Sequence, residues 1–157
     1  MKVVQKDVFS KEEKEQLWQL RNNEYPIQFG HETFEDFELY CNTIAEQKNY
    51  VLIDDKNEIQ GWAYTFFRDN EIWFAIMLDY QFQGKGYGRI LLEELKKNNT
   101  ELNGWVIDHE NDIKRNHQKY IPPLQFYILN DFSVLENTRI ENEKIAAVKI
   151  NWKNNKK

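Results

Sequence analysis

The stretch Gln83-Gly84-Lys85-Gly86-Tyr87-Gly88-Arg89 stands between an apolar run, residues 72–78, and the amphipathic residues 90–97. Three of the chain's six glycines lie in these seven residues. Glycine lets the backbone take positive φ angles and approach a ligand closely. The helix expected to follow offers unpaired N–H groups and the positive end of its dipole. With Lys85 and Arg89 as nearby cations, the pattern predicts a loop that binds phosphate oxygens.

Two widespread phosphate-binding motifs fit this stretch poorly. The loop of nucleoside triphosphatases has Lys-Ser/Thr after its last glycine, whereas Gly88 is followed by Arg89. The dinucleotide motif is Gly-x-Gly-x-x-Gly, whereas the glycines here alternate at positions 84, 86 and 88. A plain glycine-rich turn with a solvated lysine stays open as an alternative on this pattern alone.

The segments around the loop predict a mixed α/β domain. Residues 72–78 are apolar almost throughout, which is typical of a central strand covered on both faces. Strands are also expected at residues 50–53 and 59–67, which a turn at 55–57 joins. Residues 104–108 form a further short strand, expected to run parallel to 72–78 across the intervening helix. Residues 146–152 alternate as a half-buried strand does.

Helix signals complete this picture at both ends of the chain. Ser10 and Glu13 have the spacing of a capping box, and Pro26 ends the helix that they begin. Thr33 is the expected cap of a second helix, and Val3 and Val4 indicate a short strand before the first. Residues 122–129 begin with proline, which is favoured at the start of a helix.

Length and composition limit the classes of protein that this chain can belong to. The 157 residues, 19.1 kDa and 41% hydrophobic, fit one folded domain at 1–152 followed by a solvated tail at 153–157. The 26 acidic residues outnumber the 21 basic ones, which argues against a dedicated nucleic-acid binder. No apolar run reaches the ~18–20 residues of a membrane span, and the first residues lack the apolar stretch that is typical of a secretion signal. We therefore expect a cytoplasmic protein without a membrane partner.

Cysteine and histidine usage predicts neither a disulfide nor a metal centre. Cys41 is the only cysteine, and it is expected to be a half-buried helix residue. The histidines, His31, His109 and His117, do not show the spacing of metal ligands. No metal is expected.

With these elements in order, the sequence resembles the GNAT family of N-acetyltransferases, whose diphosphate loop reads Gln/Arg-x-x-Gly-x-Gly/Ala. Gln83, Gly86 and Gly88 stand at the fixed positions, and residues 126–132 resemble the family's Tyr-x-x-x-Gly-Phe element. The resemblance covers about residues 50–132. It departs at Asp131, where the family has glycine, and the family's frequent asparagine before the tyrosine has no counterpart. The implied fold is a mixed, mostly antiparallel sheet, splayed between two parallel strands and flanked by about four helices.

The resemblance also implies a reaction, in which an acetyl group moves from acetyl-CoA to a primary amine by direct attack through a tetrahedral intermediate. By position, Tyr127 matches the tyrosine that protonates the departing thiolate, although a tyrosine on an apolar helix also suits plain packing. A catalytically inactive acyl-CoA-binding sensor of the same fold is the alternative. The residues implied to bind acetyl-CoA are Ile76, Leu78, Gln83, Gly84, Lys85, Gly86, Gly88 and Arg89.

The base and the acceptor follow less directly from the residues. Asp108 and His109, at the carboxyl end of the strand at 104–108, are candidates for the general base that the reaction requires, and ordinary loop polarity is the alternative. Residues 24–38 are acidic and aromatic, which would suit a cationic amine but also a solvated helix pair. We expect a small-molecule or peptide amine as acceptor, and exposed edge strands that allow a homodimer.

Overall fold

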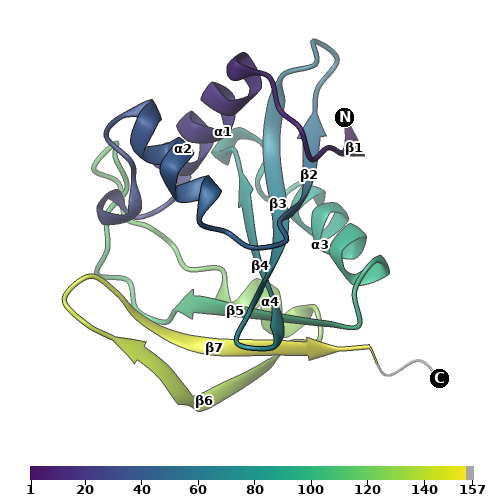
Figure 1. The fold of residues 1–157 in the computed structure, drawn as a ribbon. Helices are drawn as coiled ribbons and strands as arrows, with labels where there is room; N and C mark the ends of the chain where they lie inside the picture. Colours follow the sequence, from purple (N-terminus) through teal and green to yellow (C-terminus); the bar gives the residue numbers. More distant parts are fainter. Residues whose placement is uncertain (155–157) are drawn as a thin grey trace.

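The computed structural model describes residues 1–154 and contains one seven-stranded sheet in the order β1-β2-β3-β4-β5-β7-β6 (Figure 1). All neighbouring strands are antiparallel except β4 and β5, which are parallel. The strands are β1 (Lys2–Gln5), β2 (Lys48–Ile53), β3 (Ile59–Arg68), β4 (Glu71–Leu78), β5 (Glu101–Ile107), β6 (Ser133–Glu141) and β7 (Ala146–Lys153). The helices are α1 (Lys11–Glu24), α2 (Phe34–Asn42), α3 (Tyr87–Lys97) and α4 (Leu124–Leu129), with short 3-10 turns η1 (Ile27–Phe29) and η2 (Tyr80–Phe82).

The sheet splits between its two parallel strands. β4 and β5 are paired only at Trp73 and Asn103, and beyond this point the two strands diverge (Figure 1). The Asn103 side chain reinforces the junction by donating to the Ile72 carbonyl at 3.1 Å. The predicted fold, a mostly antiparallel sheet splayed between two parallel strands and flanked by four helices, is confirmed.

Each face of the sheet carries its own layer of helices and its own core. On one face, Trp62, Tyr64 and Met77 pack with Leu17 and Leu20 of α1 and Phe37 of α2. On the other face, Phe74 and Leu78 pack with Leu91 and Leu95 of α3 and Tyr127 of α4. Strand side chains alternate between the two faces, so β4 contributes to both cores, as its nearly continuous apolar sequence predicts.

The predicted helix starts are confirmed at the level of hydrogen bonds. Ser10 and Glu13 form both bonds of a capping box at the start of α1, and the Thr33 side chain accepts from the Asp36 N–H at the start of α2. Pro123 directly precedes α4, which begins two residues later than the predicted start at 122. Asp69 and Asn70 form the tight turn between β3 and β4, with φ of 53° and 61°.

Two features differ from the sequence expectations. β6 was not predicted, because most of its side chains are exposed and its pairing with β7 shifts between Leu135 and Arg139. Lys153, assigned to the solvated tail, ends β7, and residues 155–157 of that tail lie outside the described residues. No helix within residues 1–154 is long and apolar enough to cross a membrane. The homodimer stays a prediction.

Candidate active site

A cavity of about 380 Å³ lies where β4 and β5 part. Its walls come from α1, the segment after α1, β3, β4, β5 and α4, so residues that are distant in the sequence face one space. The volume is at the lower end of the range for small-molecule sites. Aromatic side chains form much of the lining, namely Tyr25, Phe29, Tyr40, Tyr64, Phe66, Trp73, Phe74, Trp105, Tyr120 and Tyr127.

Tyr127 lines this cavity from the α4 side. Its side chain is 5% exposed and its ring contacts Phe74 and Phe132 edge-to-face, with centroids 5.5 and 5.2 Å away. Its hydroxyl donates no hydrogen bond to another group of residues 1–154. Burial raises the pKa of Tyr127 well above its usual value, so the phenol keeps its proton at neutral pH. A buried, protonated phenol with a free hydroxyl is suited to act as a general acid.

The turn after α4 uses Asp131 in a conformation that usually requires glycine. Asp131 has a φ of 71°, and aspartate tolerates this left-handed region better than most residues. The Phe132 N–H donates to the Tyr127 carbonyl at 3.1 Å, which closes the turn and places Phe132 against the Tyr127 ring. The substitution therefore keeps the turn that positions the tyrosine.

The glycine-rich loop leads into α3 with its amide groups unpaired. Gly84 and Gly86 take φ of 76° and 90°, and Gly86 caps α3 without a side-chain hydrogen bond. The first bond of the helix runs from the Ile90 N–H to the Gly86 carbonyl at 3.2 Å. The backbone N–H groups of residues 87–89 therefore have no partner within residues 1–154, which is the arrangement that binds phosphate oxygens.

The side chains of the loop take two different positions. Gln83 turns back and donates to the Leu78 carbonyl at 2.9 Å, which ties the loop to the end of β4. Lys85 and Arg89 are exposed, and neither forms an ion pair within the described residues. At Gly88, an added Cβ would stand 3.6 Å from the Phe126 ring, an ordinary contact. Because Lys85 and Arg89 are exposed and form no ion pair within the described residues, both cations are free to contact a phosphorylated ligand.

The edge of β4 that faces β5 is unpaired beyond Trp73. Ile76 and Leu78 pair with Ala63 and Gly61 of β3 on the other side, and β5 has diverged at their level. This free edge connects the loop after Leu78 with the cavity, which Ile76 lines. The structure thus brings the predicted CoA-binding residues onto one continuous path.

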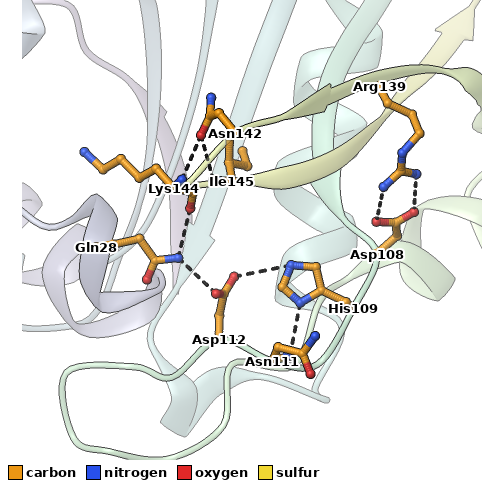
Figure 2. Close-up of polar contacts among 9 residues, drawn as sticks. All are labelled: Gln28, Asp108, His109, Asn111, Asp112, Arg139, Asn142, Lys144 and Ile145. Atoms are coloured by element: carbon orange, nitrogen blue, oxygen red, sulfur yellow. Dashed lines mark hydrogen bonds and ion pairs between the residues drawn. The ribbon is translucent and has the colours of Figure 1, made fainter.

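Asp108 and His109 lie beside the cavity but do not line it, and both are occupied by protein contacts (Figure 2). Arg139 of β6 binds Asp108 through two bonds of 2.6 and 3.1 Å, and these hydrogen bonds lower the pKa of Asp108. His109 accepts from the Asn111 N–H through Nδ1 at 3.1 Å, and its Nε2 lies 3.8 Å from Asp112. Their assignment as the general base stays a prediction.

The acidic residues expected near the acceptor are also engaged elsewhere. Glu24 pairs with Lys114 at 3.2 Å and accepts from the Tyr80 N–H at 3.1 Å. No aspartate, glutamate or histidine of residues 1–154 lines the cavity, although Tyr25 and Phe29 of the predicted aromatic set do. Within the same residues, no three His, Cys, Asp or Glu gather as metal ligands do.

The buried charged residue that does line the cavity is not an acidic one but Arg21, which the sequence analysis did not identify. It is 7% exposed, and its guanidinium lies 4.9 Å from the Tyr25 ring and 4.5 Å from the Tyr40 ring. Its Nε and Nη1 are buried without a hydrogen bond. The signal was available, because Arg21 follows Leu17 by four residues and therefore shares the apolar face of α1.

Comparisons with known proteins agree with this geometry. A sequence model of the acetyltransferase (GNAT) family matches residues 14–112. An aminoglycoside 6'-N-acetyltransferase from Enterococcus faecium is 14% identical, with a TM-score of 0.71 over 98% of this chain and 97% of that one. A phosphinothricin acetyltransferase from Sinorhizobium meliloti in complex with acetyl-CoA is 15% identical, with a TM-score of 0.67 over 98% and 89%.

A third solved structure, a spermidine N-acetyltransferase variant from Vibrio cholerae, is 15% identical and has a TM-score of 0.62 over 98% of this chain and 95% of that one. At these identities the structural likeness shows a shared fold alone. A comparison with curated protein sequences gave no significant match.

Proposed function

The chain belongs to the acetyltransferase (GNAT) family, and from this premise we propose that it acetylates the primary amine of a small molecule bound in the cavity between β4 and β5. Acetyl-CoA is the donor. One observation carries the proposal: the free edge of β4 joins a loop with unpaired amides to a cavity that a protonated phenol lines. A diphosphate, an extended arm and a thioester require these three features in this order.

Binding of the donor follows from the backbone. The N–H groups of residues 87–89 and the start of the α3 dipole hold the diphosphate, with Lys85 and Arg89 as counter-charges. The pantetheine arm extends the sheet by pairing with the free edge of β4 at Ile76 and Leu78. Because backbone groups make these contacts, the side chains there need only be apolar.

Transfer itself requires one bond to form and one to break. The amine nitrogen attacks the acetyl carbonyl carbon, and the tetrahedral intermediate then expels the CoA thiolate as the carbon–sulfur bond breaks. Tyr127, which faces the cavity with an unbonded hydroxyl, donates its proton to that thiolate. As the carbon–sulfur bond breaks, the nitrogen releases a further proton to solvent, so the amide product is neutral.

The acceptor amine must reach the carbonyl carbon in its neutral form. Because the cavity lining within residues 1–154 contains no carboxylate or imidazole, we propose that the ammonium proton leaves to solvent, before the attack. Asp108 and His109, which lie next to the cavity wall, are the alternative base. The two routes predict different pH profiles.

A small-molecule acceptor fits the modest volume of the cavity. The structural neighbours named above are enzymes of aminoglycoside, phosphinothricin and spermidine acetylation, so this fold accommodates amines of several kinds. A peptide amine is the second class of acceptor that the family premise permits.

Calorimetry and a free-thiol assay test this function. We expect the protein to bind CoA and acetyl-CoA, and to release CoA from acetyl-CoA in the presence of at least one amine from a panel. ATP and NAD serve as matched controls that carry a diphosphate without pantetheine, and we expect neither to protect against thermal unfolding. Absence of binding to both coenzymes would overturn the proposal. Tight acetyl-CoA binding without turnover of any amine would favour the inactive acyl-CoA sensor.

A further inference from the structure

The acceptor side of the cavity contains a buried cation without a counter-ion. Arg21 lines the cavity, its side chain is 7% exposed, and its Nε and Nη1 donate no hydrogen bond. No ion pair of residues 1–154 includes it. The titratable groups around it are the phenols of Tyr25, Tyr40 and Tyr64, the His31 imidazole and the Cys41 thiol, and none of these groups carries a negative charge at neutral pH.

Burying a guanidinium in such surroundings is unfavourable unless an acceptor compensates for its lost hydration. The protein itself supplies none, because no carboxylate of the described residues lines the cavity. Arg68, the other cation in the lining, is exposed and stacks on Phe66 at the rim, 4.9 Å from the ring centroid. A ligand is therefore the source of the missing negative charge.

The aromatic neighbours hold the guanidinium in a form that is ready to bind. Tyr25 and Tyr40 contact it through their rings, at 4.9 and 4.5 Å from the centroids, and such cation–π contacts fix the plane of the group without using its N–H bonds. The hydroxyls of Tyr40 and Tyr64 lie 3.3 Å apart, and Tyr64 is also within hydrogen-bonding reach of the guanidinium, yet Nε and Nη1 of Arg21 stay without an acceptor.

We propose that Arg21 binds a carboxylate of the acceptor, so that the acceptor is a small amine that also carries a carboxylate, as an amino acid does. This inference rests on the proposed function, because it places the amine of the same molecule toward Tyr127. One buried guanidinium balances the single charge of a carboxylate better than a phosphate monoester, which carries about −1.5 to −2 at pH 7. The aromatic lining receives the rest of the molecule.

The first test compares amino acids with their own amides. The free-thiol assay is run with acetyl-CoA and with the common L-amino acids, each paired with its α-amide, which keeps the amine and side chain but lacks the negative charge. We expect the acids to be preferred in kcat/KM by roughly 10–100-fold, the effect of one charge-assisted hydrogen-bonded pair. Equal rates, or a preference for the amides, would overturn the inference. Preference for O-phosphoethanolamine over every amino acid would overturn the carboxylate assignment.

The second test uses variants of Arg21. We expect Arg21→Met to remove the preference for the acid, mainly through KM, and Arg21→Lys to restore part of it. Arg115→Gln, an exposed arginine on the loop outside the cavity, is the matched control and should keep the preference. Because Arg21 is unpaired, we expect Arg21→Met to melt at the same or a higher temperature than the wild type. Loss of stability together with an unchanged preference would assign Arg21 a purely structural role.

Binding of the reaction product separates this inference from the function on which it rests. Calorimetry measures the affinity of N-acetyl amino acids and of their amides for the CoA-loaded protein, with and without the Arg21→Met change. Arg21-dependent binding of the acids supports the carboxylate site even if no amine is turned over. Turnover of amines without any acid preference overturns the carboxylate site and leaves the acetyltransferase function intact.

Discussion

The protonation and hydrogen bonding of single residues in the cavity depend on the residues that surround them. Tyr127 is buried against Phe74 and Phe132, and this burial raises the pKa of its phenol well above the usual range. Arg21 is buried with its Nε and Nη1 unbonded, and such burial of a charged group is unfavourable. The two side chains face one cavity from opposite layers of the molecule, and we propose that they mark its donor end and its acceptor end.

Replacing Tyr127 with phenylalanine removes the proposed acid and leaves the ring packing in place. We expect kcat to fall by roughly 10–10⁴-fold, while the affinity for acetyl-CoA measured by calorimetry is nearly unchanged. Tyr50→Phe is the control, because Tyr50 is a buried tyrosine of the same core that does not line the cavity. Unchanged turnover in Tyr127→Phe would remove this residue from the mechanism.

The pH dependence of the rate distinguishes the two routes for the amine proton. If the acceptor amine loses its proton to solvent, kcat/KM should rise about tenfold per pH unit up to the pKa of that amine. Because the pKa of Tyr127 is raised, its acid form persists and the rate should not decline up to about pH 9.5. If Asp108 or His109 is the base, the rate should instead fall at low pH as that base becomes protonated. Asp108→Asn or His109→Gln should then abolish this fall.

Cys41 allows a test of direct transfer. It lies half-buried in α2, as predicted, and burial raises the pKa of its thiol to about 11. Only about one thiol in a thousand is ionised at pH 8, and thiolate is the reactive form. We expect slow alkylation by iodoacetamide and full activity in Cys41→Ala. Loss of activity in this variant, with a burst of CoA release in the wild type, would indicate an acyl-cysteine intermediate.

At the scale of elements, the loop and α3 form the site at which we propose that the diphosphate binds. The positive φ angles of Gly84 and Gly86 turn the chain so that α3 begins with its amides free. An added Cβ at either glycine would meet nothing within 4 Å, so the requirement for glycine comes from the backbone conformation and from the approach of a ligand.

Gly86→Val should therefore weaken CoA binding by at least about tenfold, because the branched side chain disfavours the φ of 90° and obstructs the amides. Isothermal titration with CoA measures this. Asn57→Val, which places the same side chain at a φ of 61° in the turn between β2 and β3, controls for strain alone. Equal CoA affinity in Gly86→Val and the wild type would contradict the assignment of the loop.

For the whole molecule, the split of the sheet is the decisive feature. Two helical layers cover opposite faces of the sheet (Figure 1). The cavity lies where β4 and β5 stop pairing. On one side of the split, contacts hold β5, β7 and β6 together, among them the ion pair between Asp108, directly after β5, and Arg139 of β6 (Figure 2). Lys149 of β7 also binds Glu71 at the start of β4 at 2.8 Å, which fixes the two halves beside the split.

The Asp108–Arg139 pair predicts a pH-dependent contribution to stability. The hydrogen bonds from Arg139 lower the pKa of Asp108 in the folded state, so the contribution is present above pH ~4 and is lost as the pH falls further. We expect Asp108→Asn to melt about 1–3 °C lower at pH 7, and the difference to disappear near pH 2–3. Asp55→Asn, in an exposed turn, is the control. A difference that persists at pH 2 would refute this account.

Local signals in the sequence were enough for the helix caps, the β2–β3 turn, the conformation of the glycine-rich loop and the order of most strands. These features depend on a few neighbouring residues, such as Ser10 with Glu13 or the alternating glycines from Gly84, so their physics is contained within short segments. Even the turn at Asp131 follows from local tolerance of a positive φ.

The tertiary structure alone decided which charges face the cavity. The acidic stretch at 24–38 suggested a site for a cation, yet Glu24 is paired with Lys114, ninety residues away, and Asp108 with Arg139. β6 was missed because its exposed sequence is recognisable as a strand only through its pairing with β7. Whether a charge is neutralised or left free depends on partners that folding brings from distant parts of the chain. The place of Arg21 on the apolar face of α1 could be read from the sequence, but only the folded molecule shows that it has no ion-pair partner within the described residues.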